Sequence, residues 1–541
     1  MIPQDQTTVY AVLQASAAKW PERPFLNVLP STAEIYGIEA GETSFAGFLA
    51  QVDAWADRLS DAGFGAGMRV ALLLENRPEF FVIFVALNRL GASTVPINPD
   101  LRAAELEYLI GHAEPALIVA TSARVAELQG AADAAGVDLK AITPADELPT
   151  PRADAVVAAL AEDGTERETA VLYTSGTTGK PKGCVLANSY FLEVGRWYST
   201  QGRIISLTTK GERMITPLPI FHMNAMSYSF VAMMVVGGCL TALDRFHPRS
   251  WWQDVKDSGA TCLHYLGVMP SMLMGADPSP TDKDHNVRFG FGAGVDPKLH
   301  AKFEDRFGFP LMEAWAMTET GAGAVISNHT HDRLIGQSAL GRVPDWLDVL
   351  AADDDGNPVA EGDPGELLVR RKGDRPRLGF FSEYYKNPEA TDEAWENGWF
   401  HTGDIVRQGE DGFMFFVDRK KNVIRRSGEN IAAVEVESIL MRHPDISAAA
   451  VAAVPDPIRG DEVFACLTVT DPSPEKAEEI VRWGLGQMAY YKVPGYVAFI
   501  DTLPLTSTQK VQRAELKKLA LDLLDDPATI NTTHLKKRQV A

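Results

Sequence analysis

The sequence has 541 residues, of which 45% are hydrophobic and 23% are charged, as is typical of a globular protein with two or more domains. Its formal net charge of −21 argues against nucleic acid or an anionic membrane surface as a partner. Positive charge is concentrated at 419–426, where it can meet a small polyanion.

Segments for export, membrane insertion or metal binding are not expected. The longest apolar stretch, 230–243, is shorter than the ~20 residues that span a bilayer, and the first residues lack the pattern of a secretory signal. The cysteines are scattered without metal-ligand spacing, which indicates reduced thiols in a cytoplasmic protein. They are Cys184, Cys239, Cys262 and Cys466.

Helical and strand patterns alternate over residues 43–160 and again over 185–310. The predicted helices lie at 45–62, 80–90, 190–200, 227–236 and 248–258. The predicted strands lie at 69–74, 93–97, 117–120, 213–216, 239–243 and 262–266. Alternation of this kind indicates parallel sheet covered by helices, an α/β fold.

The pattern changes at about residue 336, and from there to 417 short strands separated by turns indicate a small antiparallel β unit. After residue 418 a compact α+β unit of about 105 residues is predicted, large enough to fold alone. Its helices are expected at 433–442, 474–488 and 513–523, and its strands at 448–454, 463–470 and 497–500. The predicted domains are therefore 1–417 and 418–524, with a loose tail at 525–541.

A loop of small, hydroxylic and cationic residues follows the predicted strand at 170–173. It offers many hydrogen-bond donors and no acidic side chain, as expected of a loop that wraps around a phosphate chain. A plain surface loop is the alternative. It is not a Walker P-loop, because Thr174 and Pro181 stand where that motif needs Gly and Ser or Thr. The predicted phosphate-binding residues are Thr174, Ser175, Gly176, Thr177, Thr178, Gly179, Lys180 and Lys182.

The string 173–183 resembles the phosphate-binding signature of the adenylate-forming superfamily, which includes acyl- and aryl-CoA ligases, beetle luciferases and peptide-synthetase adenylation domains. The resemblance runs from about residue 40 to about residue 520, and 384–391 and 425–431 are most similar to the carnitine/crotonobetaine–CoA ligase branch. It implies a large N-terminal domain of αβ-layered sheets with a small β-barrel-like subdomain, and a small mobile α+β C-terminal domain.

The resemblance also implies the reaction: ATP activates a carboxylic acid as acyl-AMP, and CoA then takes the acyl group. Two anions must be held together, which needs cations and dipoles. Lys510 matches the lysine that bridges them, although Gln509 stands where the family usually has Gly. Glu319 and Thr178 would hold Mg²⁺, and Thr318 would contact the α-phosphate.

Further contacts with the nucleotide and CoA are implied in the same way. Asp404 would accept hydrogen bonds from the ribose hydroxyls, Arg419 would support the ribose and phosphate end, and Trp315 would lie against adenine. The remaining residues implied to bind nucleotide or CoA are Gly292, Ala293, Gly294, Glu313, Ala314, Phe416, Ser427, Gly428 and Glu429. The small residues at 292–294 also fit a plain turn.

Lys421 stands where the family pivots its C-terminal domain. The rotation would withdraw Lys510 and bring 427–429 to the acyl-adenylate, so that one site serves two reactions in turn. A charged surface hairpin is the alternative interpretation of this basic stretch.

His222 matches the aromatic gate of the family and is a predicted catalytic residue, with a structural histidine as the alternative. Arg196 would meet a polar group at the far end of the acyl pocket, whereas an exposed arginine on a helix is the simpler interpretation. The predicted acyl pocket consists of Arg196, Met223, Met226, Tyr265, Gly267, Ala316 and Met317.

An AMP-forming acyl-CoA ligase is therefore the favoured function. A stand-alone adenylation enzyme that loads a carrier protein is the first alternative, and the shortness of 525–541 favours free CoA over it. A non-catalytic nucleotide-binding regulator on the same fold is the second, and the presence of Lys510, Glu319 and Asp404 argues against it. The expected partners are a small carboxylic acid, ATP, Mg²⁺ and CoA, and a homodimer is left open.

Overall fold

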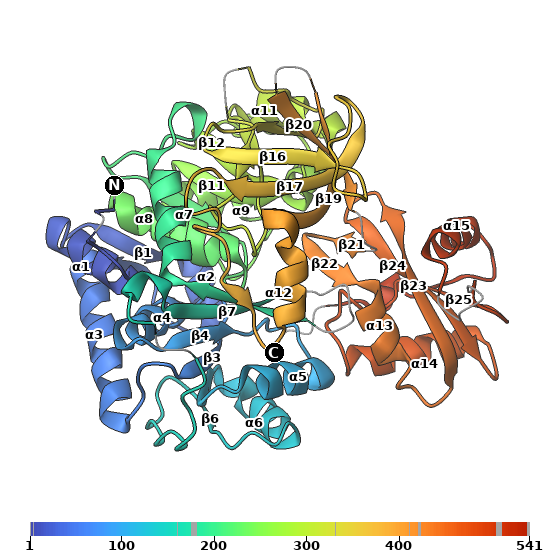
Figure 1. Cartoon of the computed structure of the whole chain (residues 1–541), viewed down its shortest axis with the longest axis horizontal. Coiled ribbons are helices and arrows are strands. Elements are labelled where there is room, and N and C mark those ends of the chain that lie inside the picture. The colour runs from blue at the N-terminus through green and yellow to red at the C-terminus, as the bar shows by residue number, and fades with distance from the viewer. Residues whose placement is uncertain are drawn as a thin grey trace.

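The computed structural model describes residues 2–3, 5–158, 161–174, 181–329, 332–409, 412–419, 423–504 and 511–537. Its strands form three sheets, and Figure 1 shows the C-terminal sheet, in orange and red, beside the larger N-terminal part. Two α/β sheets and a separate α+β unit confirm the predicted fold class.

The seven-stranded sheet has the order β18-β8-β7-β4-β3-β5-β6. Its central strand β3 is buried along its whole length and pairs in parallel with β4 and β5, which explains its continuous run of apolar residues. The strands are β3 (Arg69–Leu73), β4 (Ser93–Pro96), β5 (Leu117–Ala120), β6 (Ala141–Ile142), β7 (Glu168–Thr174), β8 (Lys182–Ala187) and β18 (Glu383–Tyr384).

The first half of the thirteen-stranded sheet is parallel over β13-β12-β11-β9-β10-β1 and ends in β2, which pairs antiparallel with β1, whereas the second half, from β14 on, is antiparallel. The strands of the first half are β1 (Pro24–Val28), β2 (Gly41–Ser44), β9 (Arg213–Thr216), β10 (Cys239–Ala242), β11 (Cys262–Leu266), β12 (Phe289–Ala293) and β13 (Leu311–Trp315). Those of the second are β14 (Ile326–Ser327), β15 (Ala339–Arg342), β16 (Leu347–Ala352), β17 (Pro364–Arg371), β19 (Phe400–Gln408) and β20 (Phe413–Arg419).

The small β unit predicted at 336–417 is antiparallel, but the expectation of a barrel-like subdomain is wrong. Among the described residues its strands pair in the order β16-β17-β19-β20-β15 and do not close on themselves. They continue the large sheet through β14 and β13, because β14 pairs antiparallel with both β13 and β15.

Helices and sheets alternate in five layers, α–β–α–β–α. α4 is buried along nearly its whole length, because its cluster of apolar side chains joins both large sheets. α5 and α6 cover the outer face of the seven-stranded sheet, and α9, α10 and α11 that of the other. The helices are α1 (Val9–Lys19), α2 (Pro30–Tyr36), α3 (Phe45–Ala62), α4 (Pro78–Leu90), α5 (Ala103–Ala113), α6 (Val125–Ala134), α7 (Asn188–Thr200), α8 (Phe230–Val236), α9 (Trp251–Ser258), α10 (Val268–Met274), α11 (Pro297–Phe307) and α12 (Pro388–Ala394).

The C-terminal unit has its own six-stranded sheet with helices on both faces. Side chains alternate along β23, so Val451 packs with α13 and α14, while Ala450 and Ala452 pack with α15. Its elements are β21 (Val423–Arg426), β22 (Glu429–Ala432), α13 (Ala433–Leu440), β23 (Ile446–Asp456), β24 (Gly460–Val469), α14 (Pro474–Leu485), β25 (Tyr496–Phe499), α15 (Arg513–Leu524) and β26 (Ile530–Asn531).

The expectation of a loose tail is wrong for residues 525–537. β26 pairs antiparallel with β25, and the buried Lys536 ammonium contacts the Glu462 carboxylate and donates to the Tyr491 carbonyl at 3.2 Å. Arg426 donates to the other oxygen of Glu462 at 2.8 Å. This polar segment is therefore held by one strand pair and one buried ion cluster, together with Ile530 and Leu535, which pack against the core of the unit.

The ion cluster makes the stability of the C-terminal unit depend on pH. Burial, and then the positive charge of Arg426, lower the pKa of Lys536 from 10.5 to about 7, even though Glu462 opposes this shift and Arg459 adds to it. Between these two pH values the unfolded chain binds more protons than the folded chain, so stability should rise with pH. We expect the free energy of unfolding of the wild type, relative to Lys536→Met, to increase from about pH 7 to about pH 10.

Denaturant unfolding of both proteins across this range measures the difference. The exposed neighbour Lys537 provides the control, since Lys537→Met should follow the wild type at every pH. A constant difference between the wild type and Lys536→Met would contradict the assigned charge behaviour.

In the described part of the chain, no helix combines the length and the apolar character needed to cross a membrane. The four cysteines are buried and unpaired, as predicted. Burial raises the pKa of the Cys239 and Cys466 thiols to about 12, which keeps them protonated and unreactive.

Candidate active site

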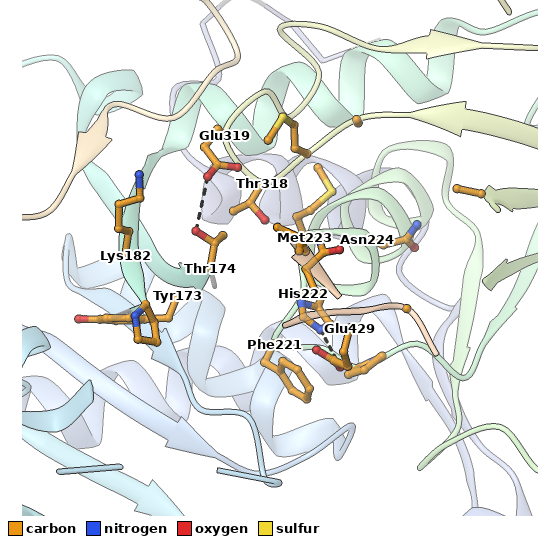
Figure 2. A pocket seen from close by; sticks show the side chains of 18 of the residues that line it. Tyr173, Thr174, Lys182, Phe221, His222, Met223, Asn224, Thr318, Glu319 and Glu429 are labelled. Carbon is orange, nitrogen blue, oxygen red and sulfur yellow. Dashed lines mark hydrogen bonds and ion pairs between the residues drawn. The ribbon is translucent and has the colours of Figure 1, made fainter. Parts of the chain in front are cut away.

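A cavity of about 620 Å³ is lined by residues of both the N-terminal part and the C-terminal unit (Figure 2). The structure brings together on its walls many of the residues that the sequence predicted to act together. They are Thr174, Lys182, His222, Met223, Tyr265, Gly292, Ala293, Ala314, Ala316, Met317, Thr318, Glu319, Gly428 and Glu429.

The ends of the predicted phosphate loop meet at one side of the cavity. Thr174 ends β7, Lys182 begins β8, and the two residues are direct partners across the antiparallel pair. This hairpin holds the two ends of the loop close together beside the cavity. The rest of the loop, comprising Ser175, Gly176, Thr177, Thr178, Gly179 and Lys180, lies outside the described residues.

Glu319 forms a polar cluster with these strand ends. Its buried carboxylate accepts a hydrogen bond from Tyr384 Oη at 2.9 Å and one from Thr174 Oγ1 at 3.4 Å. Burial, and then Glu319, raise the pKa of Tyr384, so its hydroxyl remains a donor. The Lys182 ammonium lies 3.9 Å from the Tyr384 ring centre. A carboxylate and hydroxyls beside a lysine suit a phosphate–cation complex.

Asp404 and Trp315 lie behind the cavity wall and contact each other. The Trp315 indole donates to Asp404 Oδ2 at 2.8 Å, and both side chains are buried. Arg425 of the C-terminal unit places its guanidinium 3.6 Å from Asp404 Oδ1 and 4.5 Å from the Phe416 ring centre. The residues predicted to bind ribose and adenine thus lie together, and Arg425 of β21 contacts them from the C-terminal unit. Their roles toward the nucleotide remain predictions.

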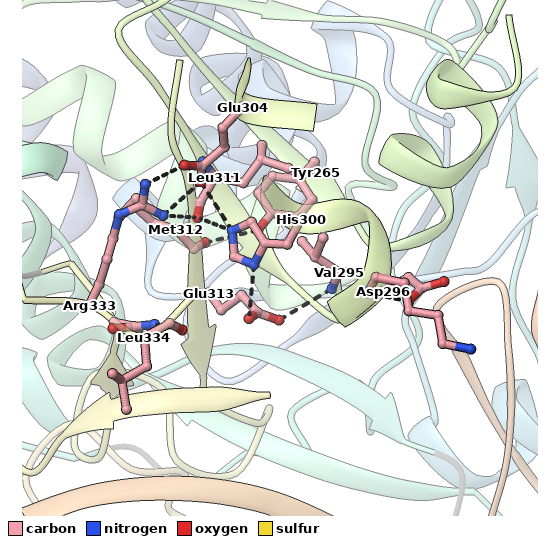
Figure 3. A network of polar contacts seen from close by, with 12 residues as sticks. Tyr265, Val295, Asp296, His300, Glu304, Leu311, Met312, Glu313, Arg333 and Leu334 are labelled. Atoms are coloured by element: carbon pink, nitrogen blue, oxygen red, sulfur yellow. Dashed lines mark hydrogen bonds and ion pairs between the residues drawn. The ribbon is translucent and has the colours of Figure 1, made fainter. Parts of the chain in front are cut away.

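Glu313 belongs to a buried polar network rather than to the cavity lining (Figure 3). It accepts a hydrogen bond from the Val295 amide at 3.2 Å and lies 3.7 Å from His300 Nδ1. His300 Nε2 in turn lies 3.1 Å from Glu304, which pairs with Arg333. Burial raises the pKa of Glu313, opposed by His300. The network fixes the turn between β12 and α11 against β13.

The glycines at the ends of β11 and β12 are required by close backbone contacts. A Cβ on Gly292 would lie 2.1 Å from the Tyr265 carbonyl oxygen, and one on Gly267 would lie 1.6 Å from that of Gly294. Gly294 itself has φ +78°, a conformation that L side chains rarely adopt. The plain-turn interpretation of 292–294 is therefore incomplete, because Gly292 and Ala293 also line the cavity, although Gly294 does not.

The hairpin of β21 and β22 inserts its turn into the cavity mouth. Ser427 and Gly428 have φ of +52° and +91°, and a Cβ on Gly428 would meet the Leu266 side chain at 2.4 Å. Glu429 Oε1 lies 3.3 Å from His222 Nε2, a contact between the two parts of the chain (Figure 2). Lys421 and Lys510 lie outside the described residues, and only the backbone of Arg419, opposite Asp404, is described.

A buried ion cluster joins the C-terminal unit to α5. Lys492 Nζ lies 2.7 Å from both Glu105 Oε1 and Glu435 Oε1, and the Ala489 amide donates to Glu105 Oε2 at 2.9 Å. Burial alone would lower the pKa of Lys492, but the two carboxylates hold it above its usual value. Tyr491 adds a cross-domain bond, accepting from Asn98 at 2.8 Å. No sequence signal could have paired Lys492 with a residue as distant as Glu105.

Three residues of the predicted acyl pocket, Arg196, Met226 and Gly267, are not among the residues that line the cavity. Arg196 pairs with Glu193 at 2.8 Å, and Glu193 also binds Arg371 at 2.7 Å. Met226 is buried in the turn before α8. The sequence analysis missed Tyr384, although that residue begins a string quoted for the family resemblance.

Comparisons with known proteins agree with this geometry. The chain matches the family described as AMP-binding enzyme over residues 13–385, and the AMP-binding enzyme C-terminal domain over residues 435–510. The crotonobetaine/carnitine–CoA ligase of Salmonella typhimurium is 30% identical over 488 residues, covering 88% of this chain and 93% of that protein. The corresponding ligase of Escherichia coli is 29% identical over 491 residues, covering 86% and 91%.

Solved structures share the fold. A malonyl-CoA ligase in a ternary product complex with methylmalonyl-CoA and AMP has a TM-score of 0.72 at 25% identity, covering 89% of this chain and 97% of that one. The o-succinylbenzoate CoA synthetase of Bacillus subtilis has a TM-score of 0.76 at 23% identity, covering 94% and 98%.

Proposed function

The chain belongs to the family of AMP-binding enzymes, and on this premise we propose that it is an ATP-dependent acyl-CoA ligase. A small carboxylic acid and ATP form acyl-AMP and pyrophosphate, and CoA then takes the acyl group and releases AMP. The observation that carries the proposal is the shared cavity, which is lined both by Thr318 and Glu319 and by Gly428 and Glu429 of the C-terminal unit.

The nucleotide side of the cavity fits ATP with a divalent cation. Lys182 offers donors to phosphate oxygens, and Glu319 is a buried carboxylate already aligned by the hydroxyls of Thr174 and Tyr384. Glu319 would hold Mg²⁺, with Thr178 proposed as a second ligand. The cation would neutralise charge on the phosphates, while Lys182 would orient them.

The position of the β21–β22 hairpin, with its turn in the cavity, fits the second half-reaction, in which CoA takes the acyl group. Gly428 has no side chain where the turn lines the cavity, which leaves room for the thiol arm of CoA to approach the acyl group. We propose that the C-terminal unit pivots at Lys421 and that Lys510 replaces this turn in the cavity during adenylation. The His222–Glu429 contact supports the thioester-forming arrangement, because it exists only when the hairpin is docked.

Product analysis tests the function. The protein is incubated with ATP, Mg²⁺ and a panel of carboxylic acids, with CoA, with a carrier protein bearing phosphopantetheine, or with no acceptor. An acyl-CoA ligase releases AMP and acyl-CoA with free CoA and shows pyrophosphate exchange without an acceptor. Acyl transfer to the carrier alone would instead establish a carrier-loading enzyme, and nucleotide binding without AMP release would establish a regulator.

Arg196 tests the extent of the acyl pocket. Because Arg196 pairs with Glu193 and does not line the cavity, Arg196→Ala should change kcat/KM for a monocarboxylic and a dicarboxylic acid of equal length by the same factor. The ratio of the two kcat/KM values is the measurement. A loss of about 1.5–3 kcal/mol in transition-state stabilisation for the dicarboxylic acid alone is the size expected for a lost hydrogen bond to a charged group. Such a loss would show that Arg196 does contact the acyl group.

A further inference from the structure

Asn224 lies on the wall of the cavity, on the side away from the nucleotide residues. Figure 2 shows its side chain beside Met223, with Thr174 and Lys182 on the opposite side of the view. It begins a π-helical turn, Asn224–Ser229, that leads into α8. Such turns are rare in proteins, and those that occur are often found at functional sites.

A buried histidine fixes the orientation of the Asn224 carboxamide. Asn224 Oδ1 lies 2.7 Å from His264 Nδ1, which is also 2.9 Å from the hydroxyl of Ser229. A carboxamide oxygen only accepts, so Nδ1 carries the proton, and Nε2 accepts from the Tyr198 hydroxyl at 3.1 Å. Burial lowers the pKa of His264 to about 3, so the imidazole is neutral and this tautomer is stable.

The consequence is an amide nitrogen that offers its donors to the cavity. The Asn224 oxygen faces His264, and the side-chain nitrogen bonds to no described residue and is not among the buried polar atoms. Asn224 is only partly buried, so this nitrogen is open to the cavity. A ligand that covers this nitrogen without accepting a hydrogen bond would leave a desolvated donor without a partner, which weakens binding.

Aromatic side chains form part of the neighbouring wall. Tyr228 and Phe291 line the cavity, and the Tyr228 hydroxyl is already bonded to the Gly321 carbonyl. Among the described lining residues the lysines are Lys182, on the nucleotide side, and Lys492, which is held by two carboxylates. A second carboxylate on the ligand would therefore meet no unpaired lysine or arginine on this side of the cavity among the described lining residues, and burying it there would be costly. A neutral oxygen atom fits both the donor and its surroundings.

We propose that Asn224 is a specificity-determining residue that selects carboxylic acids whose acyl group carries a neutral oxygen acceptor, such as a hydroxyl, keto or ether oxygen. His264 acts through Asn224 as a positioning residue. The inference rests on the proposed function, since it names the class of acid that the proposed ligase activates. Sites built to hydrogen-bond a substrate discriminate strongly against analogues that lack the bonding group.

Binding of matched acids tests the proposal independently of catalysis. Calorimetry compares unbranched acids of four to ten carbons with analogues of equal length that carry one keto oxygen at each successive position, and with the dicarboxylic acids. The wild type should bind at least one keto acid about tenfold or more tightly than its plain counterpart, which is about 1.4 kcal/mol. In Asn224→Leu this ratio should fall to about one, with the plain acid still bound.

Two further variants separate recognition from folding. Asn224→Asp keeps the size of the side chain and loses the donor, so the preference should again disappear. His264→Phe should reduce the preference while retaining affinity for the plain acid, a selective change that a purely structural role would not produce. Asn357→Leu, at an exposed loop position, is the control and should keep the wild-type ratio.

The outcomes distinguish this inference from the proposed function. No preference anywhere in the wild-type panel, an unchanged preference in Asn224→Leu, or tighter binding of the dicarboxylic acid would overturn the selection of a neutral acceptor. A preference that is lost in Asn224→Leu, in a protein that releases no AMP from any acid, would support the recognition site and refute the ligase function.

Discussion

Replacing Lys510 with Ala should lower the rate of acyl-AMP formation by at least ~10²–10³-fold, the effect of losing one preorganised electrostatic donor. The ammonium group is proposed to bridge the carboxylate and the α-phosphate, and it matters only while these two anions are brought together. Transfer of the acyl group from preformed acyl-AMP to CoA should be retained, because the Gly428 turn rather than Lys510 then faces the acyl group. Pyrophosphate exchange and single-turnover thioester formation measure the two steps separately.

Lys518 provides the matched control, since it is an exposed lysine of the same unit, on α15. Lys518→Ala should leave both half-reactions unchanged. Near-normal pyrophosphate exchange in Lys510→Ala would remove this lysine from the adenylation step, and equal losses in both half-reactions would indicate damage to the C-terminal unit as a whole.

Replacing Lys492 with Met should slow the second half-reaction by about 10²–10³-fold, because Glu105 and Glu435 would remain buried without their cation. Breaking a buried ion pair by removing one partner typically costs about 3–5 kcal/mol. The cost falls on the docked arrangement, in which α5 and the C-terminal unit share the cluster. Adenylation should be affected less, because it is proposed to occur in the other arrangement, in which the hairpin of β21 and β22 is outside the cavity. The measurement is again the pair of isolated half-reactions.

Glu105→Gln isolates the contact between the two parts of the chain, because Lys492 keeps Glu435 within its own unit. We expect a smaller loss of thioester formation, about 1.5–3 kcal/mol, the range for hydrogen bonds to charged groups. Glu107→Gln, at an exposed position on the same helix, is the control. If both glutamine variants transferred the acyl group at the wild-type rate, the Lys492 cluster would not hold the docked state.

Comparing Lys492→Met with Lys510→Ala also tests which half-reaction each arrangement of the C-terminal unit serves. Lys492→Met weakens the docked state, whereas Lys510→Ala impairs the chemistry proposed for the other arrangement. The two variants should therefore accumulate different species when supplied with ATP, acid and CoA together. Lys492→Met should accumulate acyl-AMP, and Lys510→Ala should leave ATP and the acid unconsumed.

Local patterns in the sequence determined the elements and the family. The helix predicted at 45–62 and the strands predicted at 117–120, 213–216 and 262–266 have the predicted bounds in the structure, because periodicity and end signals act within a few residues of the chain. The phosphate-loop string and the Glu319 motif indicated the family for a related reason, since each is a contiguous segment of the chain.

Only the tertiary structure decided which distant side chains meet. Lys492 and Glu105, His222 and Glu429, and Asn224 and His264 are far apart in the sequence, and each pair forms because sheets and helices bring separate segments to one place. The tail at 525–537 shows the same limit, since a polar segment was predicted to be loose but is ordered by a strand partner and by Glu462. Burial and pairing energies depend on the surroundings in space, and local sequence patterns do not contain those surroundings.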